Sequence, residues 1–143
     1  MTTVDRADLT IAALVEQLAR RVQNMCLTKD LAPVQWSALR YFSHAGSSAR
    51  TVTGLTAYSG VNQSSATRTV QLLQKKGLVE IQVEGRFKRI SLTEKGRRML
   101  DRDPLMQLET AVADIDPGAK AMLRDALAML LLRLYRKPFS EPR

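Results

Sequence analysis

Residues 62–92 have the sequence NQSSATRTVQLLQKKGLVEIQVEGRFKRISL, and their hydrophobic period changes part-way along. The first half begins at a good N-cap residue and ends at Gly77, which suits the left-handed position after a helix. Apolar side chains recur in this half at helical spacing, at Ala66, Val70 and Leu73. In the second half, apolar and polar residues alternate in two runs that a glycine-containing turn joins. We therefore predict a helix followed directly by a β-hairpin.

The sequence on both sides of this stretch is mainly helical. Apolar residues recur at steps of three and four over about residues 5–27, 33–43, 51–59, 93–102, 105–115 and 116–135. Asp103 and Pro104 are expected to interrupt the helical pattern, and Asp116 with Pro117 to start the last helix. The predicted fold class is mainly α with a small β-hairpin wing, as a winged helix-turn-helix flanked by N- and C-terminal helices.

Basic residues are concentrated in the middle of the chain. The sequence of 143 residues has a formal net charge of +8, and residues 50–102 contribute eleven basic and four acidic side chains to it. Residues 1–49 and 103–143 are close to neutral. This segregation predicts a localised polyanion-binding surface, whereas the alternative is a basic face that only water solvates.

The predicted helix before the hairpin has a polar face without any acidic side chain. The order of helix, helix, turn, helix and basic hairpin over residues 33–92 is typical of a winged helix-turn-helix, whose later helix enters the major groove of DNA. Arginine and lysine attract phosphates, and short polar side chains can hydrogen-bond to base edges. The predicted DNA-binding residues are Asn62, Gln63, Ser64, Ser65, Thr67, Arg68, Arg86, Lys88 and Arg89.

Several blocks of the sequence resemble the multiple antibiotic resistance regulator (MarR) family. They are residues 31–36 (LAPVQW), Leu55 and Val61 around the turn, residues 73–79 (LQKKGLV) and residues 92–96 (LTEKG). The resemblance extends over nearly the whole chain. It implies a homodimeric transcriptional regulator that binds a pseudo-palindromic operator in double-stranded DNA, often a repressor that a small ligand releases.

The wing departs from the family pattern at two of three positions. Where the family usually has an aspartate, a basic residue and an arginine, this chain has Glu84, Gly85 and Arg86, so only the arginine is carried over. The hairpin also looks short, which favours backbone contact by Arg86 and Lys88 over deep insertion into the minor groove. Pro104 is a further departure from the family.

The resemblance assigns the whole chain, residues 1–143, to one MarR-like domain. About residues 30–92 would form the winged helix-turn-helix DNA-binding part, and about 5–27 and 93–136 the helical dimerisation part. A stripe of leucines supports the second assignment, because it continues along one face of the last predicted helix at Leu123, Leu127, Leu130 and Leu134.

The ligand pocket of the family lies near the predicted second helix, so the resemblance implies a pocket formed by Arg21, Met25, Trp36 and Leu39. Arg21 favours a small aromatic or anionic effector, for which an apolar wall would supply binding energy. A tryptophan beside Leu39 is equally consistent with the hydrophobic core, and that alternative stays open.

Cys26 is the single cysteine and has two interpretations. It could act as a redox switch, as in the peroxide-sensing branch of the MarR family, or be an inert buried thiol, which its place at the end of the first helix favours. A further alternative is an architectural or non-specific basic DNA-binding protein without ligand control.

Nothing in the sequence predicts an enzyme. One histidine, one cysteine and no glycine-rich phosphate loop leave no expected catalytic residue, metal site or cofactor. The first residues lack the basic and apolar segments of a signal peptide, and the longest apolar run, residues 126–132, is too short for a bilayer. We expect a cytoplasmic protein that has no membrane partner.

Overall fold

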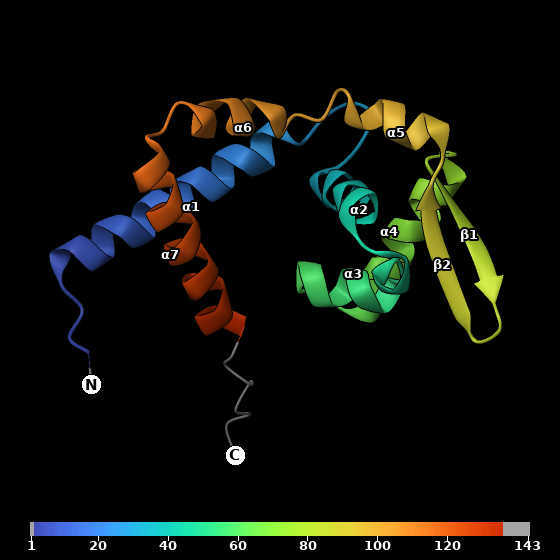
Figure 1. The fold of residues 1–143 in the computed structure, drawn as a ribbon, viewed down its shortest axis with the longest axis horizontal. Coiled ribbons are helices and arrows are strands. Elements are labelled where there is room, and N and C mark those ends of the chain that lie inside the picture. The colour runs from blue at the N-terminus through green and yellow to red at the C-terminus, as the bar shows by residue number, and fades with distance from the viewer. Residues whose placement is uncertain (1, 136–143) are drawn as a thin grey trace, which may run out of the picture. The chain divides into compact units, whose positions relative to one another are not determined.

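The computed structural model describes residues 2–135, so residue 136 of the predicted dimerisation part lies outside it. The chain divides into two compact units, Met1–Met106 and Gln107–Arg143, which we describe separately. In chain order (Figure 1) the elements are α1 (Arg6–Met25), α2 (Pro33–His44), the 3₁₀ turn η1 (Ser47–Ala49), α3 (Val52–Ser59), α4 (Gln63–Lys75), β1 (Val79–Glu84), β2 (Phe87–Leu92), α5 (Glu94–Leu100), α6 (Met106–Ala113) and α7 (Pro117–Tyr135). Between residues 2 and 135, no helix combines the length and apolar character that a bilayer span requires.

The predicted fold class is confirmed. The described residues form seven α-helices and one antiparallel pair of strands, mainly α with a hairpin wing. The segment between the helices predicted over residues 33–43 and 51–59 contains the short turn η1. The Tyr41 hydroxyl donates to the Ala49 carbonyl at 2.6 Å and thereby fastens this turn to α2. Burial raises the pKa of the Tyr41 hydroxyl above its ordinary value.

Local capping explains where the helices begin and end. The side chains of Thr51, Asn62 and Thr93 each accept a hydrogen bond from the backbone N–H three residues later, at the starts of α3, α4 and α5. Gly60 and Gly77 follow α3 and α4 with left-handed φ angles of 71° and 75°. These predicted boundaries are therefore confirmed.

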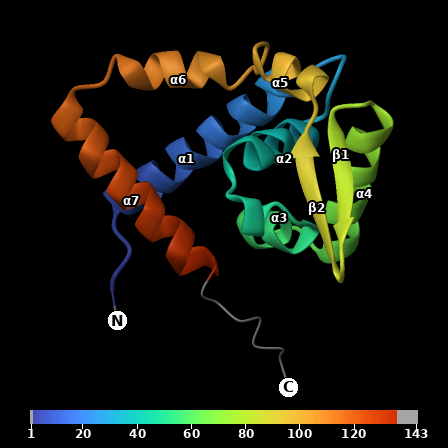
Figure 2. The same ribbon diagram turned by 45° about the vertical axis from the view of Figure 1, so that its right-hand side comes forward.

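The core of the first unit lies between α2, α3, α4 and the hairpin. α3 packs on α2 and α4, and the hairpin lies beside α4 (Figure 2). The predicted core positions of α4 are all buried, so the amphipathic pattern determines which face of α4 is turned outward. The buried apolar residues of the cluster are Cys26, Leu31, Trp36, Ala38, Leu39, Phe42, Leu55, Ala66, Val70, Leu73, Leu78, Val79 and Ile90.

The wing is a two-stranded hairpin in which β1 and β2 pair along their whole length. Gly85, with a φ of 61°, is the first of its two turn residues, as a type II′ turn requires. Ile90 is buried, and its N–H donates to the Arg50 carbonyl at 2.8 Å. The base of the hairpin is thus fixed to the core and to the segment before α3, whereas its tip extends beyond both.

Gly96 allows α5 to approach the backbone between α4 and β1. A Cβ atom at this position would overlap the carbonyl oxygen of Leu78. Beside it, the Thr93 hydroxyl donates to the Gly77 carbonyl at 2.6 Å, and the Thr93 N–H donates to the Leu78 carbonyl at 3.1 Å. The LTEKG block therefore caps α5 and seats it on the end of α4.

The predicted interruption at Asp103 and Pro104 is also confirmed, since α5 ends at Leu100 and α6 begins at Met106. The Asp103 carboxylate is buried, lies 2.6 Å from the Nε atom of Arg40 and accepts the Leu105 N–H at 3.0 Å. This ion pair joins α2 to the segment after α5, which are 63 residues apart in sequence.

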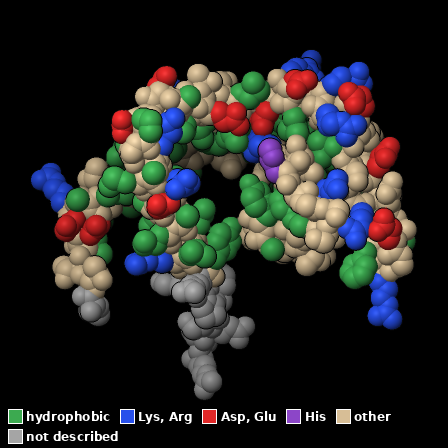
Figure 3. All heavy atoms as spheres, viewed as in Figure 1, with side chains coloured by type: hydrophobic (Ala, Val, Ile, Leu, Met, Phe, Trp, Pro, Cys, Tyr) green, Lys and Arg blue, Asp and Glu red, His purple; other side chains and the backbone are tan. Residues whose placement is uncertain are grey.

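The second unit leaves most of its large apolar side chains exposed (Figure 3). As predicted, α7 begins after Asp116, whose carboxylate accepts the N–H groups of Gly118 and Ala119 at 3.0 and 3.2 Å. No residue of α6 or α7 is buried. A hollow of about 580 Å³ lies in this unit and is lined by Val112, Pro117, Lys120, Ala121, Leu123, Arg124 and Leu127.

Candidate nucleic-acid interface

α4 presents a polar face on the side away from the core. Gln63, Ser64, Ser65 and Arg68 are exposed, and Thr67 is half-buried. No acidic residue occurs in α4, so this helix has no carboxylate that would repel a phosphate. The helix thus has the surface that the sequence predicts, while its contacts with DNA stay a prediction.

Some of these polar groups already have partners within α4. The Asn62 amide oxygen accepts the Ser65 N–H at 2.8 Å and the Ser64 hydroxyl at 2.9 Å. The Thr67 hydroxyl donates to the backbone one turn earlier, at 2.9 Å. Among the described residues, no hydrogen bond engages the side chains of Gln63 and Arg68. These two long side chains are therefore the ones that we expect to reach base edges.

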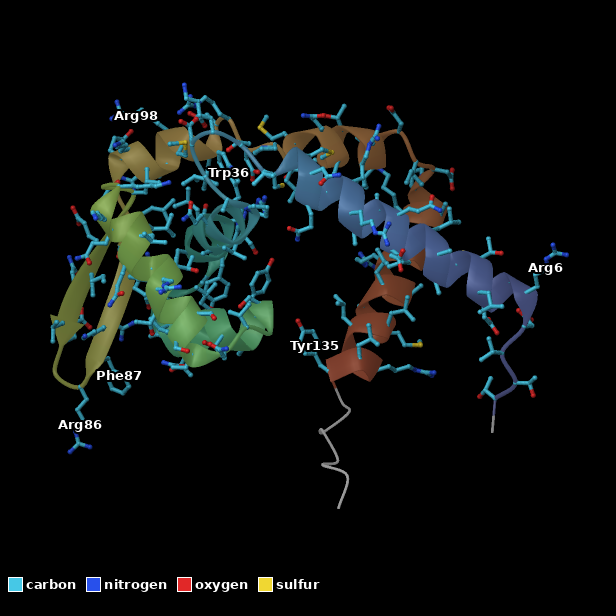
Figure 4. The ribbon with its side chains drawn as sticks, turned by 180° about the vertical axis from the view of Figure 1, so that it is seen from behind. Arg6, Trp36, Arg86, Phe87, Arg98 and Tyr135 are labelled. Atoms are coloured by element: carbon cyan, nitrogen blue, oxygen red, sulfur yellow. The ribbon has the colours of Figure 1, made fainter. Side chains whose placement is uncertain are left out.

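The hairpin turn projects Arg86 beyond the tip of the wing (Figure 4). Arg86 and Lys88 are exposed, and no carboxylate of the described residues forms an ion pair with either. Arg89 differs, because its Nε atom lies 2.7 Å from Glu84 and its Nη1 atom donates to the Ser47 carbonyl. Arg89 thus holds the hairpin against η1, which leaves Arg86 and Lys88 as the free cations of the wing.

The basic excess of residues 50–102 is divided between two places, which the sequence did not reveal. Five of the eleven cations belong to the segment before α3, to α4 and to the hairpin: Arg50, Arg68, Arg86, Lys88 and Arg89. The other six belong to the end of α4 and to α5 or the turn after it: Lys75, Lys76, Lys95, Arg97, Arg98 and Arg102. Figure 4 shows Arg98 at the opposite end of the hairpin from Arg86.

Several cations of this second group stabilise the fold itself. The Lys76 ammonium donates to the Asp30 carbonyl at 2.6 Å, and the Lys95 ammonium donates to the Lys76 carbonyl at 3.0 Å. The first bond joins the end of α4 to the loop before α2, and the second satisfies a carbonyl at the C-terminus of α4, where helical partners are lacking. The charge count of the sequence therefore overstates how many cations of this segment face a polyanion.

The four predicted pocket residues differ in exposure. Trp36 and Leu39 are 2% and 0% exposed, Met25 is half-buried and Arg21 is exposed. The indole N–H of Trp36 donates to the Thr28 hydroxyl at 3.1 Å, so its polar atom is satisfied within the core. The core interpretation of Trp36 is confirmed, and a ligand role for the four residues stays a prediction.

Cys26 lies in a buried polar cluster that the sequence did not predict. Its thiol is 3% exposed, and the Nη2 atom of Arg40 donates to its sulfur at 3.5 Å. The same guanidinium pairs with Asp103. Burial agrees with the interpretation of an inert thiol, since an oxidant needs access to the sulfur.

Comparison with known families identifies the segment that carries these features. The model of the MarR family matches residues 29–90, from the loop before α2 into β2. Residues 29–90 are thus similar to the MarR family in both sequence and winged-helix fold. The family resemblance of the sequence is thereby confirmed over these residues, while their assignment as the DNA-binding part stays a prediction. No curated protein matches the chain.

Solved structures extend the MarR fold over the rest of the chain. Sco3205, a MarR family regulator from Streptomyces coelicolor in complex with DNA, has a TM-score of 0.74 at 17% identity, over 100% of this chain and 96% of its own. A MarR/EmrR family regulator from Acinetobacter sp. ADP1 has a TM-score of 0.72 at 20% identity, over 95% of this chain and 100% of its own. CouR from Rhodococcus jostii RHA1, bound to p-coumaroyl-CoA, has a TM-score of 0.70 at 22% identity, over 88% of this chain and 92% of its own. At these identities the likeness shows the fold.

Proposed function

We propose that this protein is a transcriptional regulator that binds specific sequences of double-stranded DNA and has no enzymatic activity. The observation that supports the proposal is the acid-free polar face of α4 next to a hairpin whose tip presents Arg86 and Lys88. α4 would contact base edges in the major groove, while the wing would contact the phosphate backbone. Among the structural relatives, Sco3205 is described in complex with DNA.

Selection of bound fragments from the source genome tests this function directly. Nuclease protection on the recovered fragments should reveal a short pseudo-palindrome, with half-sites about one DNA turn, ~34 Å, apart, because a two-fold dimer places its two recognition helices at this spacing. Uniform recovery without a common motif would favour the alternative of an architectural, non-specific DNA-binding protein. Recovery of no fragment at low salt would overturn both.

Replacement of Arg86 and of Arg68 by alanine should weaken DNA binding in two different ways. Arg86→Ala should lower affinity for all duplexes similarly and reduce the slope of log K against log salt by about 0.9, the value for one lost phosphate contact. Arg68→Ala should weaken binding to the selected operator more than to random duplex, because a contact with a base edge is specific. Fluorescence anisotropy over a series of salt concentrations measures both.

Arg98→Ala is the matched control for these two variants. Arg98 is an exposed arginine of α5, at the far end of the hairpin from Arg86 (Figure 4), so its loss removes the same charge without changing the proposed interface. We expect affinity and salt slope to stay close to those of the parent. If Arg98→Ala weakened binding as much as Arg86→Ala, net charge and not the α4–wing surface would govern binding.

We further propose that the regulator is a homodimeric repressor. α1, α6 and α7 bury none of their residues, although α1 and α7 each carry several large apolar side chains. Exposed apolar surface of this extent is typical of an interface with another protein. A second copy of the chain would cover it and would place two α4 helices on one operator, where the bound dimer would block transcription.

A small aromatic or anionic ligand would release the repressor. The exposed Arg21, one helical turn before the half-buried Met25 in α1, would attract the anion. CouR, a structural relative, is described with p-coumaroyl-CoA bound. A coupling free energy of about 1–3 kcal/mol would suffice, since it corresponds to a 5- to 150-fold loss of operator affinity. The burial of Cys26 gives the redox alternative no comparable support.

Titration of aromatic acids against free protein and against the operator complex tests this release, with Trp36 fluorescence as the signal. Linkage requires that an effector which lowers operator affinity binds the complex more weakly by the same factor. Arg21→Ala should weaken binding of the acid and leave operator affinity unchanged. Equal affinity for both protein forms would contradict release by the ligand, and binding of no acid would contradict the proposed effector class.

A further inference from the structure

The tip of the wing exposes two apolar side chains. Val83 is 70% exposed and Phe87 is 64% exposed. They belong to adjacent pairs of the register, Val83 with Lys88 and Glu84 with Phe87. Adjacent pairs point to opposite faces of a hairpin, so the two side chains cannot shield one another from water.

Folding explains the apolar residues at the base of the hairpin but not Phe87. Val79 and Ile90 are buried, and Ile81 packs against the core from the same face. Phe87 lies on the other face, where its neighbours across and along the strands are the polar residues Gln82, Glu84, Arg89 and Ser91. An alternating strand places polar side chains on this outer face, so an exposed aromatic ring there contributes little to the stability of the fold.

The surroundings of the ring are cationic. Arg86 precedes Phe87 and Lys88 follows it, and Figure 4 shows Arg86 beyond the turn with Phe87 beside it. The one acidic side chain at the tip, Glu84, is paired with Arg89 at 2.7 Å. The tip therefore presents an apolar ring next to Arg86, with Lys88 on the opposite face of the hairpin, and neither cation has a carboxylate partner among the described residues.

A groove of duplex DNA is complementary to this arrangement. Its two walls are rows of phosphates, which attract the two cations, and its floor consists of sugars and base edges, against which an apolar ring can pack. Proteins that bind the minor groove insert apolar wedges such as phenylalanine between base steps and bend the duplex. The short hairpin favours backbone contact over deep insertion from the sequence alone, but its six-residue strands place the exposed tip beyond the core, where it is free to enter a groove.

We propose that Phe87 is an apolar wedge that enters the DNA minor groove beside the operator half-site, while Arg86 and Lys88 bind the flanking phosphates. This inference rests on the proposed DNA-binding function and adds a specificity element to it. Unstacking costs least at flexible pyrimidine–purine steps, so the wedge selects such a step at the position beneath the wing.

The test compares Phe87→Ala and Phe87→Leu with the parent on the duplex recovered by selection. Phe87→Ala should lower affinity about tenfold, the order expected for the loss of one aromatic contact to a base. Its salt slope should match that of the parent, because no phosphate contact is lost, in contrast to Arg86→Ala. Phe87→Leu retains an apolar wedge and should keep most of the affinity. Circular dichroism should show that both variants are folded.

A duplex series with 2-aminopurine at successive steps beneath the wing supplies a second measurement. The parent should raise 2-aminopurine fluorescence at one step, where insertion unstacks the base, and Phe87→Ala should not. If Phe87→Ala bound the duplex as tightly as the parent, the inference would be overturned and the proposed function would stand. The exposed ring would then point to a protein partner. A salt slope reduced to that of Arg86→Ala would also overturn it, because the ring would then only position Arg86. If the parent bound no duplex, both proposals would fail.

Discussion

Replacement of Asp103 by alanine is expected to lower the free energy of unfolding by about 3–5 kcal/mol, the usual cost of removing one partner of a buried ion pair. The Asp103 side chain is 8% exposed and lies 2.6 Å from the Nε atom of Arg40, so its loss leaves a guanidinium charge without its counter-ion. It also removes the acceptor of the Leu105 N–H. The free energy of unfolding of a whole domain is only about 5–15 kcal/mol. The urea concentration at the midpoint of unfolding should therefore fall markedly.

Asp101→Ala is the matched control for this variant. Asp101 is exposed, lies two residues earlier and forms no side-chain hydrogen bond or ion pair among the described residues. Its replacement should change the free energy of unfolding by no more than about 0.5 kcal/mol. Similar unfolding midpoints for Asp101→Ala and Asp103→Ala would contradict the importance of the pair.

A double variant separates the unpaired charge from the loss of packing. Arg40→Met with Asp103→Leu removes both charges and keeps apolar volume in their place. Replacement of a whole buried ion pair by apolar residues is often neutral for stability, so the double variant should be more stable than Asp103→Ala. If the double variant were as unstable as Asp103→Ala, the lost hydrogen bonds of the carboxylate would account for the loss of stability, and the unpaired charge of Arg40 would not.

Local sequence patterns predicted much of the first unit because the features that determine it are local. The caps at Asn62 and Thr93 each act on a backbone N–H three residues away. Gly77 adopts a left-handed φ angle because it has no Cβ atom. The alternation of β1 and β2 likewise depends on neighbouring residues alone. Each of these features needs only a few consecutive residues, so a single sequence contains enough information to predict it.

The contacts that the sequence did not predict join residues that are distant along the chain. Arg40 meets Asp103 across 63 positions, and Arg89 meets the Ser47 carbonyl across 42. No periodic pattern marks such partners, so Arg89 was expected only as a free DNA-binding cation. The same limit applies to Lys76 and Lys95, whose charges satisfy backbone carbonyls that a charge count cannot identify.

Replacement of both Leu127 and Leu130 by glutamate should convert the proposed homodimer into a monomer. These leucines belong to a stripe on α7 with Leu123 and Leu134, and all four are exposed in the single chain. Burial of one leucine contributes about 1.5–3 kcal/mol, and a two-fold interface counts each substitution twice. Two buried carboxylates per chain would add a desolvation penalty, so we expect dissociation at micromolar concentration.

Sedimentation equilibrium and operator binding check this result together. The parent should sediment as a dimer, and Leu127→Glu with Leu130→Glu as a monomer whose operator affinity falls steeply, since one chain can occupy only one half-site. The control is Leu127→Met with Leu130→Met, which keeps the apolar volume, costs less than about 1.5 kcal/mol per site and should remain dimeric. Circular dichroism should confirm that the glutamate variant keeps its winged helix, whose core excludes α7. A folded glutamate variant that still sediments as a dimer would show that α7 does not form the interface, and a monomeric parent would contradict the homodimer itself.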